Sequence, residues 1–133
     1  HLLTMEAGQL PPEAFRAAVS RMDYLVMPYQ ADVYDLICSG SSLDALAYLR
    51  PIVAIRSSYF ERLFEAAGDI GHLCATPDDL IACIEKLLLQ PEPQRYQQQA
   101  QRLRAARRLF APEAVAQELR AVLAEPRQPA ERA

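Results

Sequence analysis

Four small residues, Ser39-Gly40-Ser41-Ser42, form the segment of this sequence whose residue types most clearly suggest chemistry. They follow a stretch rich in Tyr and Asp at 29–38 and lead into a helical pattern at about 41–49. Small residues at a helix N-terminus leave backbone N–H groups accessible, and the helix dipole adds partial positive charge there. The segment therefore predicts a phosphate-binding site in which three serine hydroxyls flank one glycine.

The same segment also has a purely structural interpretation. In Ser41-Ser42-Leu43-Asp44, Ser41 can cap the helix while Asp44 stands at the third helical position, which is the pattern of a capping box. A capping box stabilises a helix without any ligand. On spacing alone, both interpretations stay open.

Other chemical signatures are missing from the sequence. Its four glycines allow neither GxGxxG nor GxxxxGK[ST], and there is no GxSxG motif, so dinucleotide-binding, P-loop and nucleophile-elbow sites are not expected. Three cysteines form no CxxC pair and only His1 and His72 could supply imidazole, so we expect a reducing compartment and no metal site. His72 is expected to be a structural residue of a strand or loop.

Composition excludes several classes of protein. The chain has 133 residues, 51% of them hydrophobic, which suffices for one domain with a core. A formal net charge of −3 argues against a general nucleic-acid binder. No apolar stretch approaches the roughly 18 residues of a membrane span, and no signal peptide is visible. The run Arg95–Arg108 is expected to be a solvated helix face, with contact to anionic lipid as the alternative.

Apolar runs alternate with helical patterns along the chain. The runs Tyr24–Met27 and Ile52–Ile55 predict strands buried on both faces, and Gly71–Cys74 predicts a weaker one. This alternation predicts an α/β fold with a parallel, Rossmann-like sheet of about four strands, covered by helices on both faces. Ligands of such sheets bind beyond the carboxyl ends of the strands, which here places residues 28–42 and Arg56-Ser57-Ser58 at the site.

Proline, glycine and capping signals bound the expected helices. Thr76-Pro77-Asp78-Asp79 predicts a capping box, and Gly68 predicts a helix C-terminus. Helices are expected from Pro12, at 41–49 with Leu43, Leu46 and Ala47 on one face, after Tyr59-Phe60, from Pro77, at 93–109 and at 112–124. The domain should span residues 1–124, followed by a disordered tail at 125–133.

The order of these motifs resembles the C-terminal, donor-binding half of the retaining, group 1 type nucleotide-sugar glycosyltransferases of the GT-B fold. Asp23–Tyr29 is similar to the family's Asp, apolar strand, Pro-Tyr segment, and Tyr34 with Ser39-Gly40 is similar to its Tyr-x4-Ser-Gly pattern. Asp44–Ala54 is similar to its Glu-Ala-Met/Leu-Ala-x-Gly-x-Pro-Val-Val-Ala segment. The helices after residue 78 are similar to those that close the family's domain.

The resemblance implies roles for particular residues. Ser39, Gly40 and Ser41 would hold the diphosphate of a UDP- or GDP-type sugar donor, Asp44 its ribose, and Tyr29, Tyr34 and Asp35 would line the sugar site. No cofactor, metal or nucleic acid is implied, and no catalytic residue is assigned. The chain departs from the family at Asp44, where Glu is usual, and at Leu49, where Gly is usual. Leu36 occupies the position of the first acidic residue of the family's Glu-x7-Glu pair.

The function expected from the resemblance is transfer of a sugar to an unknown acceptor by a bacterial cytoplasmic enzyme, with the inner-membrane surface as an alternative location. An N-terminal acceptor domain would complete the enzyme, and this chain alone should be inactive. The exposed apolar stripe expected on the last helix suggests a partner or a homo-oligomer. Two alternatives stay open: a non-catalytic binding or interaction module that retains the fold, and an unrelated small α/β domain.

Overall fold

The computed structural model describes residues 10–29 and 40–124. Tyr34, Asp35, Ser39 and the tail 125–133 therefore lie outside the described residues. The strands are β1 (Leu25–Met27), β2 (Ile52–Ile55) and β3 (Gly71–Cys74). The helices are α1 (Pro12–Ser20), α3 (Gly40–Tyr48), α4 (Ser58–Ala67), α5 (Pro77–Leu89), α6 (Pro93–Ala106) and α7 (Pro112–Ala124).

The three strands form one open parallel sheet in the order β1-β2-β3. Leu25 lies opposite Ile52, and Ile52 lies opposite Gly71. The predicted parallel pairing of residues 24–27 with 52–55 is thus confirmed. Within the described part of the chain the sheet has three strands rather than about four. The protein has the expected α/β architecture, with a small sheet.

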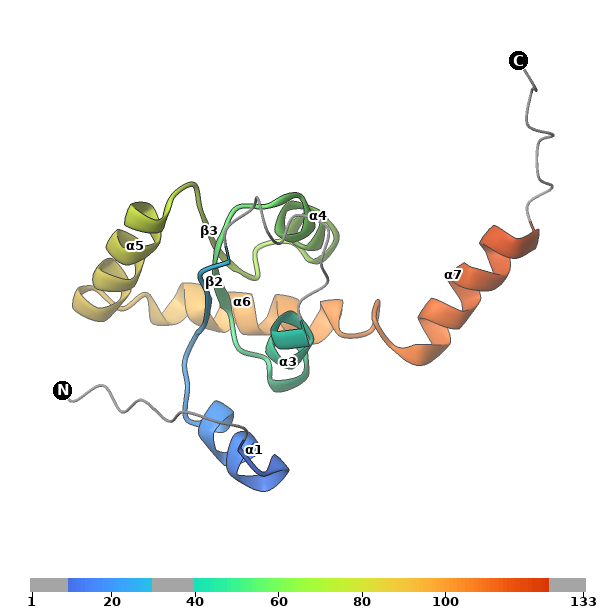
Figure 1. The fold of residues 1–133 in the computed structure, drawn as a ribbon, viewed down its shortest axis with the longest axis horizontal. Coiled ribbons are helices and arrows are strands. Elements are labelled where there is room, and N and C mark those ends of the chain that lie inside the picture. The colour runs from blue at the N-terminus through green and yellow to red at the C-terminus, as the bar shows by residue number, and fades with distance from the viewer. Residues whose placement is uncertain (1–9, 30–39, 125–133) are drawn as a thin grey trace, which may run out of the picture.

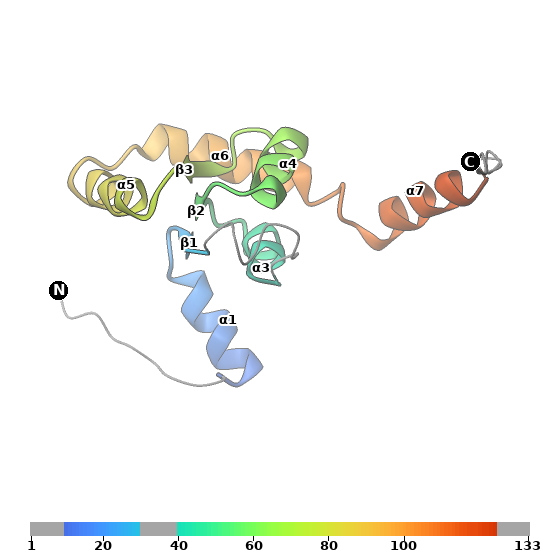
Figure 2. The ribbon, with the colours of Figure 1, turned by 45° about the horizontal axis from the view of Figure 1, so that its top comes forward.

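Helices cover both faces of this sheet (Figures 1 and 2). On one face, Met27, Ile52 and Ala54 pack against residues of α3, α4 and α6, including Leu46, Phe60, Leu63 and Leu103. On the other face, Val53, Ile55 and Cys74 pack against Leu80 of α5. Successive side chains of β2 point to opposite faces, so the strand contributes two residues to the packing on each face. All four of its residues are buried.

Strand β1 differs from β2 because α5 packs mainly on β2 and β3. Val26 points to that second face and is 45% exposed. The expectation that residues 24–27 are buried on both faces is therefore wrong for Val26. An apolar run predicts a strand, but burial of both its faces also requires a helix above each of them.

Local signals located most helix ends correctly. The predicted capping box of α5 is present: the Thr76 hydroxyl accepts from the Asp79 amide (3.1 Å), and the Asp79 carboxylate accepts from the Thr76 amide (3.0 Å). Gly68 ends α4 with φ of 82°, a left-handed conformation that glycine adopts without strain. Helix α6 ends at Ala106, three residues before the predicted end.

Helix α3 corrects two sequence-based expectations. Ser41 lies inside the helix, which already includes Gly40, so Ser41 is not its N-cap. The buried residues of α3 are Ser42, Ala45 and Leu46, whereas Leu43 is 47% exposed. Ala47, predicted to share the buried face, is exposed. The buried face of α3 is rotated from the predicted one because Ser42, a polar residue, occupies a buried position on it.

Helix α7 extends away from the sheet and the other helices (Figures 1 and 2). None of its residues is buried, and its apolar side chains Val115, Leu119, Val122 and Leu123 are exposed. The expected exposure of this stripe is confirmed. No helix among residues 10–29 and 40–124 combines the length and apolar character that crossing a membrane requires.

Candidate functional site

The candidate site lies at the carboxyl edge of the sheet, where β1 and β2 end side by side. Met27 pairs with Ala54, so the segments that follow the two strands emerge at the same edge. Pro28 and Tyr29 follow β1, and Arg56-Ser57 follows β2 and leads into α4. The parallel pairing therefore brings together the described start of the first predicted segment, Pro28-Tyr29, and the second one, Arg56-Ser57.

Two hydroxyl pairs join this edge to helix α3. The Tyr29 hydroxyl lies 3.3 Å from Ser41 Oγ. Ser42 Oγ, fully buried, is hydrogen-bonded to the Tyr59 hydroxyl of α4. Ser42 and Tyr59 are 17 residues apart, so local spacing gave no signal for their contact. The ring of Tyr59 also packs edge-on against Phe60 at 5.2 Å, as expected for an aromatic pair with a packing role.

Gly40 leaves the start of α3 open. Among residues 10–29 and 40–124, a Cβ atom added at this position would meet no atom within 4 Å, and the residue is exposed. Its described neighbours therefore do not require glycine here. What glycine provides is an uncovered backbone in the first turn of a nine-residue helix, where N–H groups lack intrahelical acceptors.

Asp44 lies one turn further along α3 and shares a small cavity with Ser41. The cavity has a volume of about 180 Å³, and its apolar wall comes from α1 and β1, including Phe15, Val19 and Met27. Sites that enclose a drug-sized ligand usually measure about 300–1,000 Å³. This cavity can therefore receive one moiety of a larger ligand and not a whole nucleotide sugar.

The charges at this edge are partly neutralised. Arg56 is half exposed, and its guanidinium forms an ion pair with the Glu61 carboxylate at 3.0 Å. Ser57 caps α4 by accepting from the Phe60 amide at 3.3 Å. No group of three or more potential ligands for a metal ion occurs in the described residues. The structure thus unites Tyr29, Gly40, Ser41 and Asp44, while Tyr34, Asp35 and Ser39 lie outside the described residues.

A second cavity, larger than the one beside Asp44, lies on the α5 face of the sheet. Its volume is about 430 Å³, and it opens beside Val26, the residue that α5 leaves uncovered. The lining is mainly apolar and comes from β1, α5 and the start of α6: Tyr24, Val26, Ile84, Leu87, Leu88 and Tyr96 are among its residues. No pattern in the sequence indicates this cavity, because periodicity does not show that the second face of the sheet is only partly covered.

His72 lies in β3, as expected for a structural histidine. Its ring is 6.0 Å from that of Tyr24, and its Nε2 atom is buried without a hydrogen-bond partner among the described residues. Burial is the main cause that lowers the pKa of His72, and the positive charge of Arg95 adds to it. Burial is also the main cause that raises the pKa of Tyr24, and electrostatic interaction with Tyr96 adds to it. These groups lie on the α5 side, so they take no part in the candidate site.

No family model, curated protein or solved structure matches this chain.

Proposed function

We propose that this chain is the donor-binding part of a nucleotide-sugar glycosyltransferase and that the start of α3 receives the donor diphosphate. The observation that carries the proposal is the position of Gly40. It begins helix α3, whose next two residues contact Tyr29, which follows β1, and Tyr59 of α4, which follows β2, at the carboxyl edge of a parallel sheet. This is where sheets of this type bind phosphate-containing ligands.

The chemistry follows from the charge of the leaving group. When the bond between sugar and diphosphate breaks, negative charge builds up on the diphosphate. Backbone N–H groups and the dipole at the start of α3 oppose that charge, so they stabilise the transition state more than the ground state. Asp44, which lines the same cavity as Ser41, would accept hydrogen bonds from the ribose hydroxyls, and Tyr29, which contacts Ser41, would border the sugar. UDP or GDP is the expected nucleotide.

Backbone geometry at Leu49 supports the resemblance on which this proposal draws. Leu49 has φ of 56°, the left-handed region that most residues avoid. The glycosyltransferases that the chain resembles usually have glycine at this position. Leu49 therefore keeps the conformation for which glycine is suited, although the residue itself has changed.

A binding module that retains the fold without catalysis is the second candidate. Two observations favour it: the hydroxyls of Ser41 and Ser42 already bond to Tyr29 and Tyr59, and the larger cavity and the stripe on α7 are apolar. Such a module would bind another protein through its apolar surface, and it would have no affinity for nucleoside diphosphates.

Calorimetric titration with UDP, GDP and inorganic pyrophosphate distinguishes the two candidates. The first predicts that Asp44→Ala weakens binding of UDP or GDP and leaves pyrophosphate affinity unchanged or raised, because only the nucleotides carry ribose. Glu85→Ala is the matched control, since it removes the same charge from an exposed position on α5, which covers the other face. Equal losses for nucleotide and pyrophosphate would remove the ribose role, and absence of binding to any of the three favours the module.

A further inference from the structure

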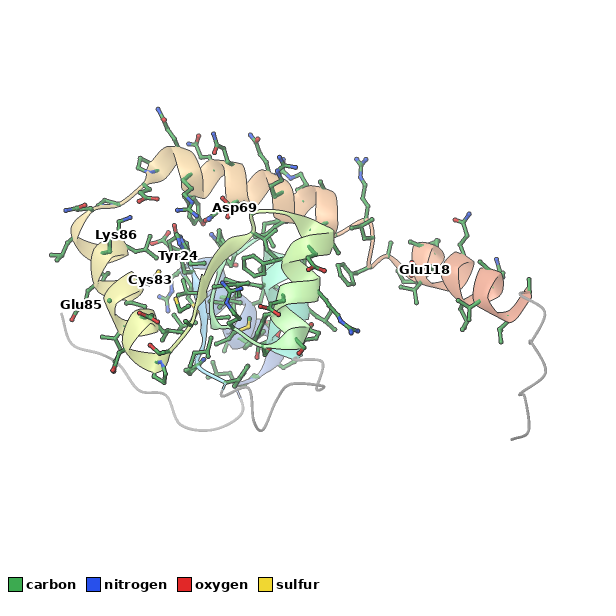
Figure 3. All side chains as sticks on the ribbon, turned by 90° about the horizontal axis from the view of Figure 1, so that it is seen from above. Tyr24, Asp69, Cys83, Glu85, Lys86 and Glu118 are labelled. Carbon is green, nitrogen blue, oxygen red and sulfur yellow. The ribbon has the colours of Figure 1, made fainter. Side chains whose placement is uncertain are left out.

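Two cysteines meet on the α5 face of the sheet. Cys74 is the last residue of β3 and is buried in a cluster with Val53, Ile55 and Leu80. Cys83 lies in the second turn of α5, is half-buried, and packs against the same cluster. Figure 3 shows Cys83 between α5 and the sheet, beside Tyr24. Neither thiol forms a disulfide in this structure.

The two side chains also lie against one another in this packing. Cys74 belongs to the buried cluster on the α5 face and Cys83 packs against that cluster. Burial, and to a smaller extent the neighbouring Cys83 side chain, raises the pKa of Cys74 to about 11. Cys74 ends strand β3 and helix α5 begins three residues later, so the fold brings both side chains to the same cluster.

We propose that Cys74 and Cys83 form a modification site. A peroxide oxidises the two thiols to an intramolecular disulfide that joins β3 to α5. Cys83 reacts first, because it is the more accessible thiol: its thiolate attacks a peroxide oxygen, the O–O bond breaks, and a sulfenic acid forms. The Cys74 sulfur then attacks the Cys83 sulfur, the S–O bond breaks, and water leaves. The two thiols together lose two hydrogens and two electrons, and one hydrogen peroxide becomes two waters.

The disulfide would restrict helix α5. It closes a short loop, from Cys74 to Cys83, that contains the Thr76 capping box. The first two turns of α5 would then be attached to β3 by the disulfide as well as by the chain. The next turns carry Ile84, Leu87 and Leu88, which line the 430 Å³ cavity. Oxidation would thus fix one wall of the cavity. This inference does not depend on the proposed sugar-transfer function.

The test uses the full chain with Cys38→Ser, so that only one intramolecular pair is available. After treatment with equimolar hydrogen peroxide, we expect loss of two hydrogens by intact mass, a peptide linking Cys74 to Cys83, no alkylatable thiol, and reversal by dithiothreitol. The oxidised chain should also have a higher thermal midpoint than the reduced chain, because a closed loop constrains the unfolded state.

Two variants supply the controls. Cys83→Ser, at a half-buried position, should keep the fold and leave Cys74 alkylatable only after unfolding, with no mass change by peroxide. Cys74→Ser should leave Cys83 as a sulfenic acid that dimedone traps. If the unsubstituted pair gives sulfinic acid at Cys83 with Cys74 still reduced, or a disulfide between two chains, the proposal is overturned. Two alkylatable thiols after treatment would overturn it as well.

Discussion

The side-chain amide of Gln99 in α6 donates to the carbonyl of Gly71, the first residue of β3, at 3.1 Å. The same Nε2 atom donates to the Asp69 carboxylate at 2.9 Å. Gln99 is fully buried, and within the part of the chain that the structure describes its Oε1 atom has no hydrogen-bond partner. This side chain therefore links α6 to β3, an edge strand of the sheet that pairs with β2 on its other side.

Gln99→Leu should lower the free energy of unfolding by about 1–3 kcal/mol, because it leaves a buried carbonyl without its donor. Urea denaturation followed by circular dichroism measures this. Gln98→Leu, at an exposed position of the same helix, is the control and should change stability by less than about 0.5 kcal/mol. Equal effects of the two substitutions would show that the buried bonds contribute nothing.

Gly71 and Gly40 should respond in opposite ways to alanine. A Cβ at Gly71 would lie 1.9 Å from the Ile52 carbonyl oxygen, whereas a Cβ at Gly40 would meet no described atom within 4 Å. We expect Gly71→Ala to cost more than about 3 kcal/mol and Gly40→Ala to be neutral or slightly stabilising, since alanine favours helix. Thermal unfolding of the two variants side by side checks this, and a stable Gly71→Ala protein would contradict the register of β2 and β3.

Thr76→Ala should destabilise the protein by about 0.5–2 kcal/mol, because it removes the hydroxyl that accepts from the Asp79 amide. Asp78→Ala, which changes charge in the same turn without touching a cap bond, serves as control. Chemical denaturation of both variants at one pH gives the comparison. A loss confined to Asp78→Ala would show that charge, and not the cap, matters at this helix start.

His72 should make stability depend on pH. Because its pKa in the folded protein is below the ordinary value of 6.5, the unfolded chain takes up the proton more readily. Its contribution to stability is therefore complete above about pH 6.5 and is lost as the pH falls below that value. Urea midpoints between about pH 7.5 and 5 should fall less steeply for His72→Gln than for wild type, and identical slopes would contradict the shift. His1 is common to both proteins and cancels.

The apolar stripe on α7 should cause self-association at raised concentration. Leu119 and its neighbours Val115, Val122 and Leu123 are exposed, and a contiguous apolar surface on a soluble domain usually marks an interaction site. Sedimentation should show an average mass that rises with concentration in wild type and stays at the monomer in Leu119→Glu. Gln117→Glu, also on α7, is the control for charge. A wild-type monomer throughout the range would contradict this expectation.

Local chemistry explains which elements could be predicted from the sequence. The Thr76 cap, the prolines that begin α1, α5, α6 and α7, and the β-branched run of β2 all act within a few residues, so their patterns identified the elements correctly. Parallel pairing of β1 with β2 followed from the helix between them. These are interactions that a short stretch of chain determines.

Tertiary contacts explain what could not be predicted. Ser42 is buried because Tyr59, 17 residues later, bonds to it, and this rotates the buried face of α3 away from Leu43. Val26 is exposed because α5 packs over the neighbouring strands. The packing of Cys83 against the cluster that contains Cys74, and the 430 Å³ cavity, likewise depend on how α5 crosses the sheet. Periodicity predicts which residues share a face, but not what covers that face.

The central claim, that the start of α3 receives a diphosphate, is tested most directly by calorimetric titration of UDP and GDP into wild type and Gly40→Val. Ala47→Val places the same side chain at an exposed position near the other end of α3 and is the control. We predict that wild type and Ala47→Val bind one nucleotide equally, while Gly40→Val binds it at least about tenfold more weakly with an unchanged unfolding midpoint. Equal affinity of wild type and Gly40→Val for both nucleotides would contradict the site assignment.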